Sequence, residues 1–564
     1  MKRLVAGAIL VSLAAAPLLV KSVDLKGWIG IHAESVQQAT PFEAARFLTQ
    51  ATFGPTDDSI ADVQSLGYEA WIDQQEAMPV SATHLAYLDA RLAQLKLTNA
   101  NAHLNTVDVY NSFWKQSVTA PDQLRQRVKL ALSEIFVISL NHAGMDPRGV
   151  GSYYDMLGDN AFVNYRTLLE KITLHPMMGT YLNSLGSQKT KSANSPHPDQ
   201  NYGREIQQLM SIGLYQLNID GALKLDDNNQ PIPTYTASDI DGLANVFTGY
   251  SWYSPAPSKS TFFGLGLGPD VTIKPMIVYS DYHSSLAKTF LGTTIPASDT
   301  PDAAGDLKIA LDTIFNHPNV GPFLGRQLIQ RLVTSNPSPA YVARVAAVFN
   351  DNGSGIRGDL GAVVKAILLD PEARDPANTS SPTFGKLREP IVRVANWMRA
   401  FNAISPSDWW RVGDTSDTVS LGQSVLNAPS VFNFWRPGYS PPRTAVGNLN
   451  LRAPEFEIVD EVSVSGYVNT MKRFVGNAFS DVQSAYANEI PLASDAGSLV
   501  NRIDILLFYG QMPADLRTKI VNLVNSVPIP AQTAGPDKIK AALTNRVELA
   551  IYLAISSPDY LTQR

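Results

Sequence analysis

Apolar residues recur three and four positions apart through most of the chain, and this spacing predicts amphipathic α-helices. The clearest stripe follows Pro121 and Asp122 and consists of Leu124, Val128, Ala131, Leu132, Ile135 and Phe136. Further helices are predicted over 305–316, 320–334, 339–350, 360–369 and 386–403, with a last helical region at 455–562. Strand-like and helical segments do not alternate regularly, so no parallel sheet is expected. The pattern predicts a mainly α fold: a large multi-helix domain with at most short β-hairpins.

Turn-forming residues separate these helices. Asp57 and Asp58 follow a turn near the start of the series, and either residue suits the cap of the next helix. Asp239 is expected in the same role further along. The middle of the chain is predicted to contain a helix at 201–215, a turn-rich stretch at 216–235 and a small hairpin that pairs 271–273 with 276–279.

The first residues have the pattern of an export signal. Lys2 and Arg3 precede an uncharged stretch from Leu4 to Val20, which matches the charged and apolar regions of a secretory signal peptide. We therefore expect a signal peptide at 1–22, an N-terminal linker at 23–40 and a secreted or periplasmic protein. An uncleaved membrane anchor is the alternative, although the apolar stretch is short for a membrane span. The remainder, 41–562, is expected to be one large helical domain, with lobes at 41–300 and 301–562 as an option.

Composition removes several classes of function. The 564 residues include 45 Lys and Arg against 51 Asp and Glu, a net charge of −6, and no long basic run. Nucleic acid is therefore not expected as a partner. Cysteine is absent, which excludes disulfides, thiolate metal sites and a cysteine nucleophile. The 45% hydrophobic content is ample for a sizeable core.

The sequence contains no P-loop, no GxSxG nucleophile elbow, no HExxH and no dinucleotide-binding glycine motif after a strand. No two of the eight histidines lie four positions apart. A metal site would therefore have to be assembled from distant segments.

A set of short segments, in order along the chain, resembles one large bacterial family. The segments are 44–56, 124–136, 175–183, 201–205, 235–239, 247–249, 283–292, 385–390, 429–433 and 557–560. Together they resemble the exported family catalogued as domain of unknown function 1800, over about 41–562. Two positions depart from its usual pattern: Gln200 replaces an acid, and Tyr250 replaces a tryptophan.

The resemblance implies an exported bacterial protein without an agreed activity. Genes of this family often lie beside those of a sulfatase-like exported family, which makes such a protein one candidate partner and suggests work on an extracellular polymer. Neither the substrate nor the oligomeric state follows from the resemblance.

Glu205 is the first candidate for chemistry. In a helix from 201, Asn201, Glu205 and Gln208 form one polar stripe, so Glu205 can act as a general acid or base, or as a metal ligand. A buried ion pair between Arg204 and Glu205 is the structural alternative.

A second group surrounds His283. Asp281, His283 and Lys288 combine a carboxylate, an imidazole and an ammonium within eight residues, which suits catalysis or anion binding. A turn in which Asp281 caps a helix from Ser284 is the alternative. His175, before Pro176, is either a ligand or a helix-end residue.

Other candidates are weaker. Tyr235 flanks a helix start, and Trp252 belongs to an aromatic-rich loop that can stack on sugars or pack the loop down. Arg388 and Glu389 are interpreted as an ordinary ion pair, and 432–437 as a packed plug.

Three hypotheses remain open. The first is a hydrolase or lyase of an extracellular polymer, plausibly a polysaccharide, with Glu205 as acid/base, Asp281 or Asp239 as second carboxylate and His283 assisting. Asn201, Arg204, Tyr235, Lys288 and Trp252 would bind the substrate. The second is a non-enzymatic envelope protein that binds a polymer or small ligand through the loop at 250–263. The third is an enzyme with a divalent metal, with His175, Glu205, Asp281 and His283 as candidate ligands.

Overall fold

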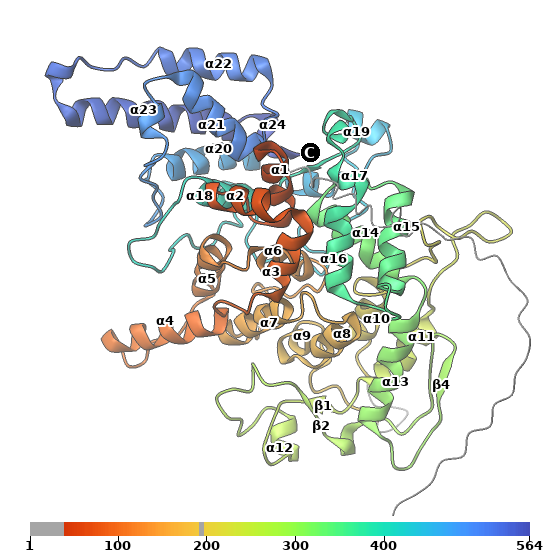
Figure 1. Ribbon diagram of the computed structural model, residues 1–564. Helices are drawn as coiled ribbons and strands as arrows, with labels where there is room; N and C mark the ends of the chain where they lie inside the picture. Colours follow the sequence, from red (N-terminus) through yellow and green to blue (C-terminus); the bar gives the residue numbers. More distant parts are fainter. Residues whose placement is uncertain (1–38, 191–196) are drawn as a thin grey trace, which may run out of the picture. The chain divides into compact units, whose positions relative to one another are not determined.

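The computed structural model describes residues 39–190 and 197–564. Within these residues the chain forms 24 α-helices and three two-stranded antiparallel sheets, which confirms the mainly α prediction (Figure 1). Residues 39–564 make up one compact unit. The predicted signal peptide, and all but the last two residues of the linker at 23–40, lie outside the described residues. In the part of the chain that is described, no helix has both the length and the apolar character to cross a membrane.

The N-terminal third is built from nine helices. They are α1 (Pro41–Ala51), α2 (Asp57–Leu66), α3 (Tyr68–Ala77), α4 (His84–Thr98), α5 (Thr106–Thr119), α6 (Gln123–Ser133), α7 (Pro147–Asp159), α8 (Tyr165–Leu174) and α9 (Pro176–Tyr181). Helix α6 carries the predicted stripe, and every residue of this helix is buried. The cap of α2 is Thr56, whose side chain pairs reciprocally with Ser59. The prediction of Asp57 or Asp58 as the cap was wrong, because these residues already lie in the first turn.

The middle of the chain contains most of the strands. Its elements are α10 (Asn201–Gln208), α11 (Ala237–Val246), β1 (Tyr250–Ser251), α12 (Lys259–Phe262), β2 (Ile277–Val278), η2 (Ser280–Tyr282), β3 (Lys288–Phe290) and β4 (Thr293–Ile295). The predicted hairpin between 271–273 and 276–279 was wrong. Strand β2 pairs instead with β1, which follows α11 directly. The helix predicted over 201–215 ends at Gln208.

The turn-rich stretch becomes an arm of short extended segments, which we define as residues 214–234. Backbone hydrogen bonds join Gln216 to Ile232 and Lys224 to Gln216, so three pieces of chain run side by side. Gly213 precedes the arm directly. Its φ is +71°, and a Cβ atom at this position would lie 2.8 Å from the ring of Phe323. Glycine is therefore required for the arm to start against this ring.

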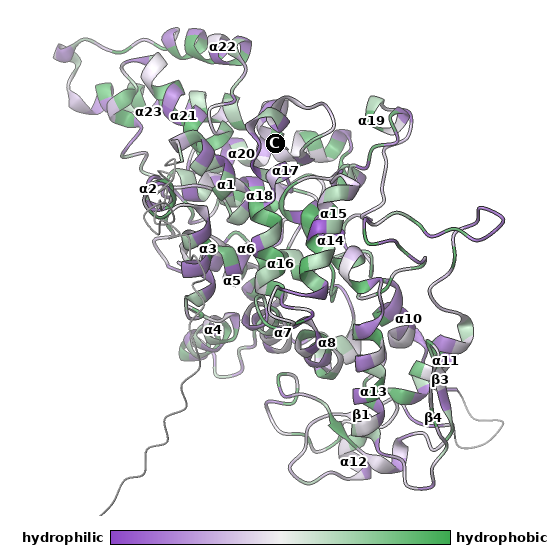
Figure 2. Cartoon of the chain, turned by 45° about the vertical axis from the view of Figure 1, so that its right-hand side comes forward, coloured by the Kyte–Doolittle hydropathy of each residue, from purple (hydrophilic) through white to green (hydrophobic). Residues whose placement is uncertain are grey.

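Four helices predicted beyond residue 300 are present with nearly the expected bounds: α13 (Ala303–Asn316), α14 (Val320–Leu332), α15 (Pro339–Asn350) and α16 (Leu360–Leu369). The short α17 (Pro371–Arg374), which was not predicted, and α18 (Pro390–Ala400) follow. Figure 2 shows that α16 is hydrophobic almost throughout, in keeping with its burial between neighbouring helices.

The prediction of a helix from residue 386 was wrong at its start. Lys386 and Leu387 form strand β5, and the helix begins at Pro390. A proline disfavours helical dihedrals at the residue before it, whereas proline itself suits the first position of a helix.

The end of the C-terminal region pairs with the segment at Lys386 and Leu387. Its main elements are α19 (Ala445–Asn448), η4 (Pro454–Ile458), α20 (Glu461–Val475), α21 (Ala496–Phe508), α22 (Ala514–Asn525), α23 (Pro536–Ile555), α24 (Pro558–Leu561) and β6 (Thr562–Gln563). Strand β6 pairs with β5, and the Gln563 amide donates to the carbonyl oxygen of Leu332 at 2.8 Å. This pairing fixes the segment around Lys386 beside the end of α14.

Candidate functional site

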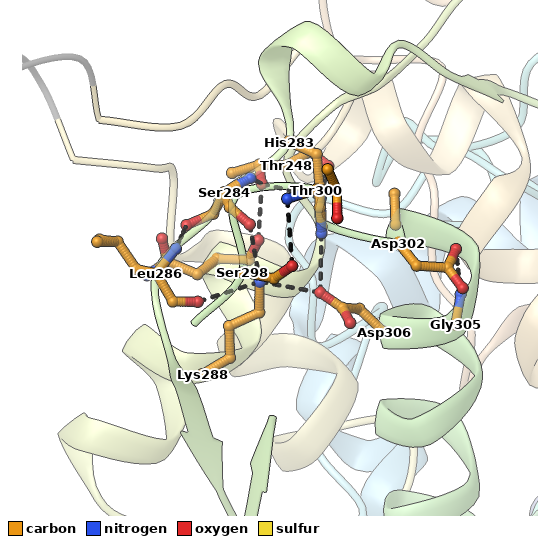
Figure 3. A network of polar contacts seen from close by, with 12 residues as sticks. Thr248, His283, Ser284, Leu286, Lys288, Ser298, Thr300, Asp302, Gly305 and Asp306 are labelled. Atoms are coloured by element: carbon orange, nitrogen blue, oxygen red, sulfur yellow. Dashed lines mark hydrogen bonds and ion pairs between the residues drawn. The ribbon is translucent and has the colours of Figure 1, made fainter. Parts of the chain in front are cut away.

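The group around His283 forms a closed, buried network. Both ring nitrogens of His283 face acceptors: Nδ1 lies 2.7 Å from the carbonyl oxygen of Thr248, and Nε2 lies 2.9 Å from Asp306 Oδ2. Lys288 Nζ contacts the same carboxylate at 2.9 Å. Figure 3 shows His283 and Lys288 pointing toward Asp306, while Asp281 is exposed on η2. The side chains of His283 and Lys288 are fully paired inside the protein, so this arrangement stabilises the fold.

Asp239 acts at the start of α11. Its carboxylate accepts from the backbone N–H of Thr236 at 2.7 Å, and Thr236 is the cap itself. It also accepts from the N–H of Leu291 at 2.7 Å. Partial burial opposes ionisation, but these hydrogen bonds outweigh it and lower the pKa of Asp239. The side chain joins α11 to the turn after β3.

Glu205 is buried on α10, as the predicted stripe requires, and Asn201 and Arg204 are half-buried. Burial raises the pKa of Glu205, and the charge of Arg204 counteracts part of this effect. The two side chains form no ion pair within 4.0 Å in the described part of the chain. Burial, and after it the charge of Glu205, raises the pKa of Tyr181 and of Tyr235. The side chain of His283 is instead paired with Thr248 and Asp306.

His175 is the cap of α9. Its Nδ1 accepts from the N–H of Met177 at 3.2 Å, and its ring packs edge-on against Tyr153. Burial lowers the pKa of His175 to about 3, so the ring is neutral. The four residues considered as metal ligands are not brought together. Within 39–190 and 197–564, no group of three or more His, Asp or Glu side chains is placed to hold a metal ion.

The aromatic loop is largely packed down. Phe262 is buried and stacks on Tyr282 with ring centroids 3.7 Å apart. Trp252 is half-buried, and its carbonyl oxygen accepts from the hydroxyl of Tyr279. Phe263 is the exposed member, at 48%.

A different set of charged side chains meets in the interior, between α6, α14, β5 and η4. Three are cations and three are carboxyl groups: Arg127, Arg331, Lys386, Glu134, Glu389 and Glu455. All six are at least 94% buried. Lys386 Nζ lies 2.9 Å from Glu455 and 3.6 Å from Glu389, and Arg331 Nε lies 3.4 Å from Glu134. We call these six residues the buried charge cluster.

Glu134 and Glu389 belong to the same cluster but face different cations: Arg331 lies 3.4 Å from Glu134, and Lys386 lies 3.6 Å from Glu389. Both side-chain oxygens of Glu134 and one of Glu389 have no hydrogen-bond donor among the described residues. Burial and the charge of Glu389 raise the pKa of Glu134 well above its usual range. Burial also opposes ionisation of Glu389, but Lys386 and Arg127 outweigh it and lower the pKa of Glu389. These opposite shifts favour the protonated form at Glu134 and the ionised form at Glu389.

Glu134 lies at the wall of a cavity of about 430 Å³. The α14 helix supplies Phe323, Arg326, Gln327, Gln330 and Arg331, because these residues share one helix face. Gln208 from the predicted polar stripe also lines the cavity, and its Oε1 accepts from the hydroxyl of Tyr235 at 3.1 Å. The arm and the segment 431–438 form further walls. Arm residues Leu214, Tyr215 and Leu223 are 43% to 49% exposed, so the cavity opens to solvent.

Sequence reasoning missed this site, although the segments that carry the family resemblance meet there. Glu134 belongs to 124–136, and Lys386 and Glu389 belong to 385–390. The prediction of an Arg388–Glu389 ion pair was wrong: Arg388 stacks over Tyr560, and Glu389 contacts Lys386 and Arg127. The segment 432–437 is a wall of the cavity rather than only a plug. Charged residues inside the resembling segments were the available signal.

Comparison with known families decides the classification. The family model described as "Protein of unknown function (DUF1800)" matches residues 46–562. The chain belongs to the DUF1800 family. No curated protein matches this DUF1800 member, and no solved structure matches it. The resemblance seen in the sequence is confirmed over nearly the whole described chain.

Proposed function

We propose that this DUF1800 protein is an exported hydrolase of an extracellular polymer, with Glu134 as the general acid. The observation that carries the proposal is the buried carboxyl of Glu134, with a pKa raised by burial and by the charge of Glu389, at the wall of a solvent-connected cavity. The charged and apolar regions at 1–22 support export. The proposal keeps the carboxylate chemistry expected from the sequence and moves it from Glu205 to Glu134.

A neutral carboxyl near pH 7 is the form that a general acid requires. It gives its proton to the leaving oxygen as the bond to that oxygen breaks, and water supplies the new hydroxyl group. Burial and the charge of Glu389 raise the pKa of Glu134, which favours retention of its proton. Lys386 and Arg127 hold Glu389 as the ionised partner.

The cavity also contains groups that can position water. Gln330 donates through Nε2 to the carbonyl oxygens of Ser335 and Pro437, and its buried Oε1 has no donor among the described residues. An unpaired buried acceptor at a cavity wall is costly unless water or a ligand satisfies it. Gln330 therefore supports a bound water on the α14 side of the site.

The position of Glu389 bears on the mechanism. Glycosidases place both of their carboxyl groups at the bond that is cleaved. Glu389 contacts Lys386 and Arg127, and it is not among the residues that line the cavity. Glu389 is therefore assigned to maintaining the protonated state of Glu134 rather than to attacking the substrate.

The experiment compares purified mature wild type with Glu134→Gln on a panel of polysaccharides and other polymers, with cleavage followed by product mass spectrometry. Wild type is expected to release fragments from one class, and Glu134→Gln to be slower by about 10²–10⁴-fold. Asp281→Asn is the matched control, since Asp281 is exposed and remote from the cavity lining. Equal loss in both variants, or full activity in Glu134→Gln, would overturn the proposal.

A further inference from the structure

Positive charge gathers in the same cavity without matching carboxylates. Among the described residues its lining contains four arginines, namely Arg326, Arg331, Arg436 and Arg452, and a single carboxyl group, that of Glu134. Arg436 pairs with Glu457 at 3.3 Å. Arg331 is the arginine that faces Glu134. The other two lining arginines belong to different parts of the chain.

Arg326 and Arg452 have no acidic partner within 4.0 Å among residues 39–190 and 197–564. Arg326 is half-buried on α14. Burial lowers the pKa of Arg326, and the charge of Arg452, an exposed residue that lines the same cavity, lowers it further. The Arg452 side chain donates one hydrogen bond, to the carbonyl oxygen of Gly438 at 3.0 Å. Two cations that line one cavity without a carboxylate partner form a site that attracts an anion.

Much of the remaining lining is apolar. The arm contributes Leu214, Tyr215, Leu217 and Leu223, and rings come from Phe323 and Phe432. Three of the arm side chains are more than 40% exposed, although their neighbours in the core are almost fully buried. Exposed apolar side chains gathered at a cavity mark a surface that a ligand covers. The ligand that fits has anionic groups on one side and an apolar face on the other.

A sugar ring with an acidic substituent has both properties. The C–H face of a sugar packs on aromatic and aliphatic side chains, and a guanidinium binds carboxylate or sulfate oxygens through paired hydrogen bonds. We propose that the cavity binds an acidic polysaccharide, whose anionic groups are held by Arg326 and Arg452 and whose ring faces lie on the arm. This proposal rests on the proposed function and specifies its substrate class.

The test measures binding separately from cleavage. Glu134→Gln protein is titrated with oligomers of polygalacturonate, with dextran sulfate and with neutral dextran, by calorimetry at 50 and 200 mM salt. The first two probes separate a carboxylate from a sulfate as the anion. Both Arg326→Gln and Arg452→Gln, placed in the Glu134→Gln background, are expected to weaken binding of the preferred acidic polymer about 10- to 100-fold. Circular dichroism verifies that each variant is folded.

Arg473→Gln is the charge-matched control, because Arg473 is exposed on α20 and does not line the cavity. It should leave the affinity for the acidic polymer within about twofold of the parent, as expected for a surface change away from the site. Binding of dextran as tight as that of the acidic polymers, absence of binding to all three, or equal losses for Arg326→Gln and Arg473→Gln would each overturn the proposal.

The outcomes also separate this proposal from the hydrolase. Arginine-dependent binding of an acidic polymer that wild type never cleaves would leave the binding site standing and remove the hydrolase. Cleavage of a neutral polymer, dependent on Glu134, would do the reverse.

Discussion

Arg331 Nε, from α14, lies 3.4 Å from the carboxyl group of Glu134, which follows α6 directly. Two further cations contact Glu389, which precedes α18: Lys386 from β5 at 3.6 Å and Arg127 from α6 at 3.9 Å. The C-terminal strand β6 fixes β5 in place. The surroundings of Glu134 at the cavity wall therefore depend on segments that lie far apart in the sequence.

Substitution by glutamine should lower the stability of the protein at Glu389 but not at Glu134. Glu389→Gln removes the charge that Lys386 and Arg127 contact, so the free energy of unfolding at pH 7 should fall by about 3–5 kcal/mol. Glu134→Gln keeps a neutral group of the same shape, so no loss is expected. Urea unfolding of both variants checks this. Equal destabilisation would show that Glu134 is ionised in the folded protein.

The pH dependence of stability gives an independent check on Glu134. The pKa of Glu134 is raised in the folded state. Its contribution to folding stability is therefore fully present below the unfolded pKa near 4.5 and is lost as pH rises toward the folded pKa. In that window wild type should lose up to about 1.4 kcal/mol per pH unit relative to Glu134→Gln. Unfolding midpoints of the two proteins at pH 5 and pH 8 measure the difference. A constant difference across the range would contradict the raised pKa.

The local sequence pattern predicted the helices but not the functional site. The bounds of α15 and α16 follow from the spacing of apolar residues and from Pro339, and these signals act over a few neighbouring residues. The prediction of Asp239 as the cap of α11 was wrong, because Thr236 is the cap and Asp239 completes the capping box three residues later. The buried charge cluster depends instead on bringing α6, α14, β5 and η4 together, and no local pattern encodes this. Glu205 was chosen because it lies on a polar stripe of its helix, but Gln208 is the member of that stripe that lines the cavity.

The network around His283 should behave as a structural element. Asp306→Asn leaves Lys288 buried without its anion, so a loss of about 3–5 kcal/mol in unfolding free energy is expected. Asp281→Asn, at an exposed position, should stay within about 0.5 kcal/mol of wild type. Thermal and urea unfolding of both variants test this. A stable Asp306→Asn protein would contradict the structural role, and a severe effect of Asp281→Asn would return that residue to the list of candidates.

His175 should contribute to acid sensitivity in the opposite direction to Glu134. Its pKa falls from 6.5 to about 3 in the folded protein because the ring is buried. A lowered histidine pKa means that the unfolded chain binds more protons below pH 6.5, so folded stability decreases as pH falls from 6.5 toward 3. His175→Asn keeps an acceptor for the N–H of Met177 and removes the titration. The variant should therefore lose less stability between pH 6.5 and pH 4.5 than wild type, by about 1.4 kcal/mol per pH unit.

Urea unfolding at three pH values measures the slope, and ¹⁵N NMR of the ring reports its protonation directly. An imidazolium signal for His175 at pH 5 would contradict the buried neutral cap.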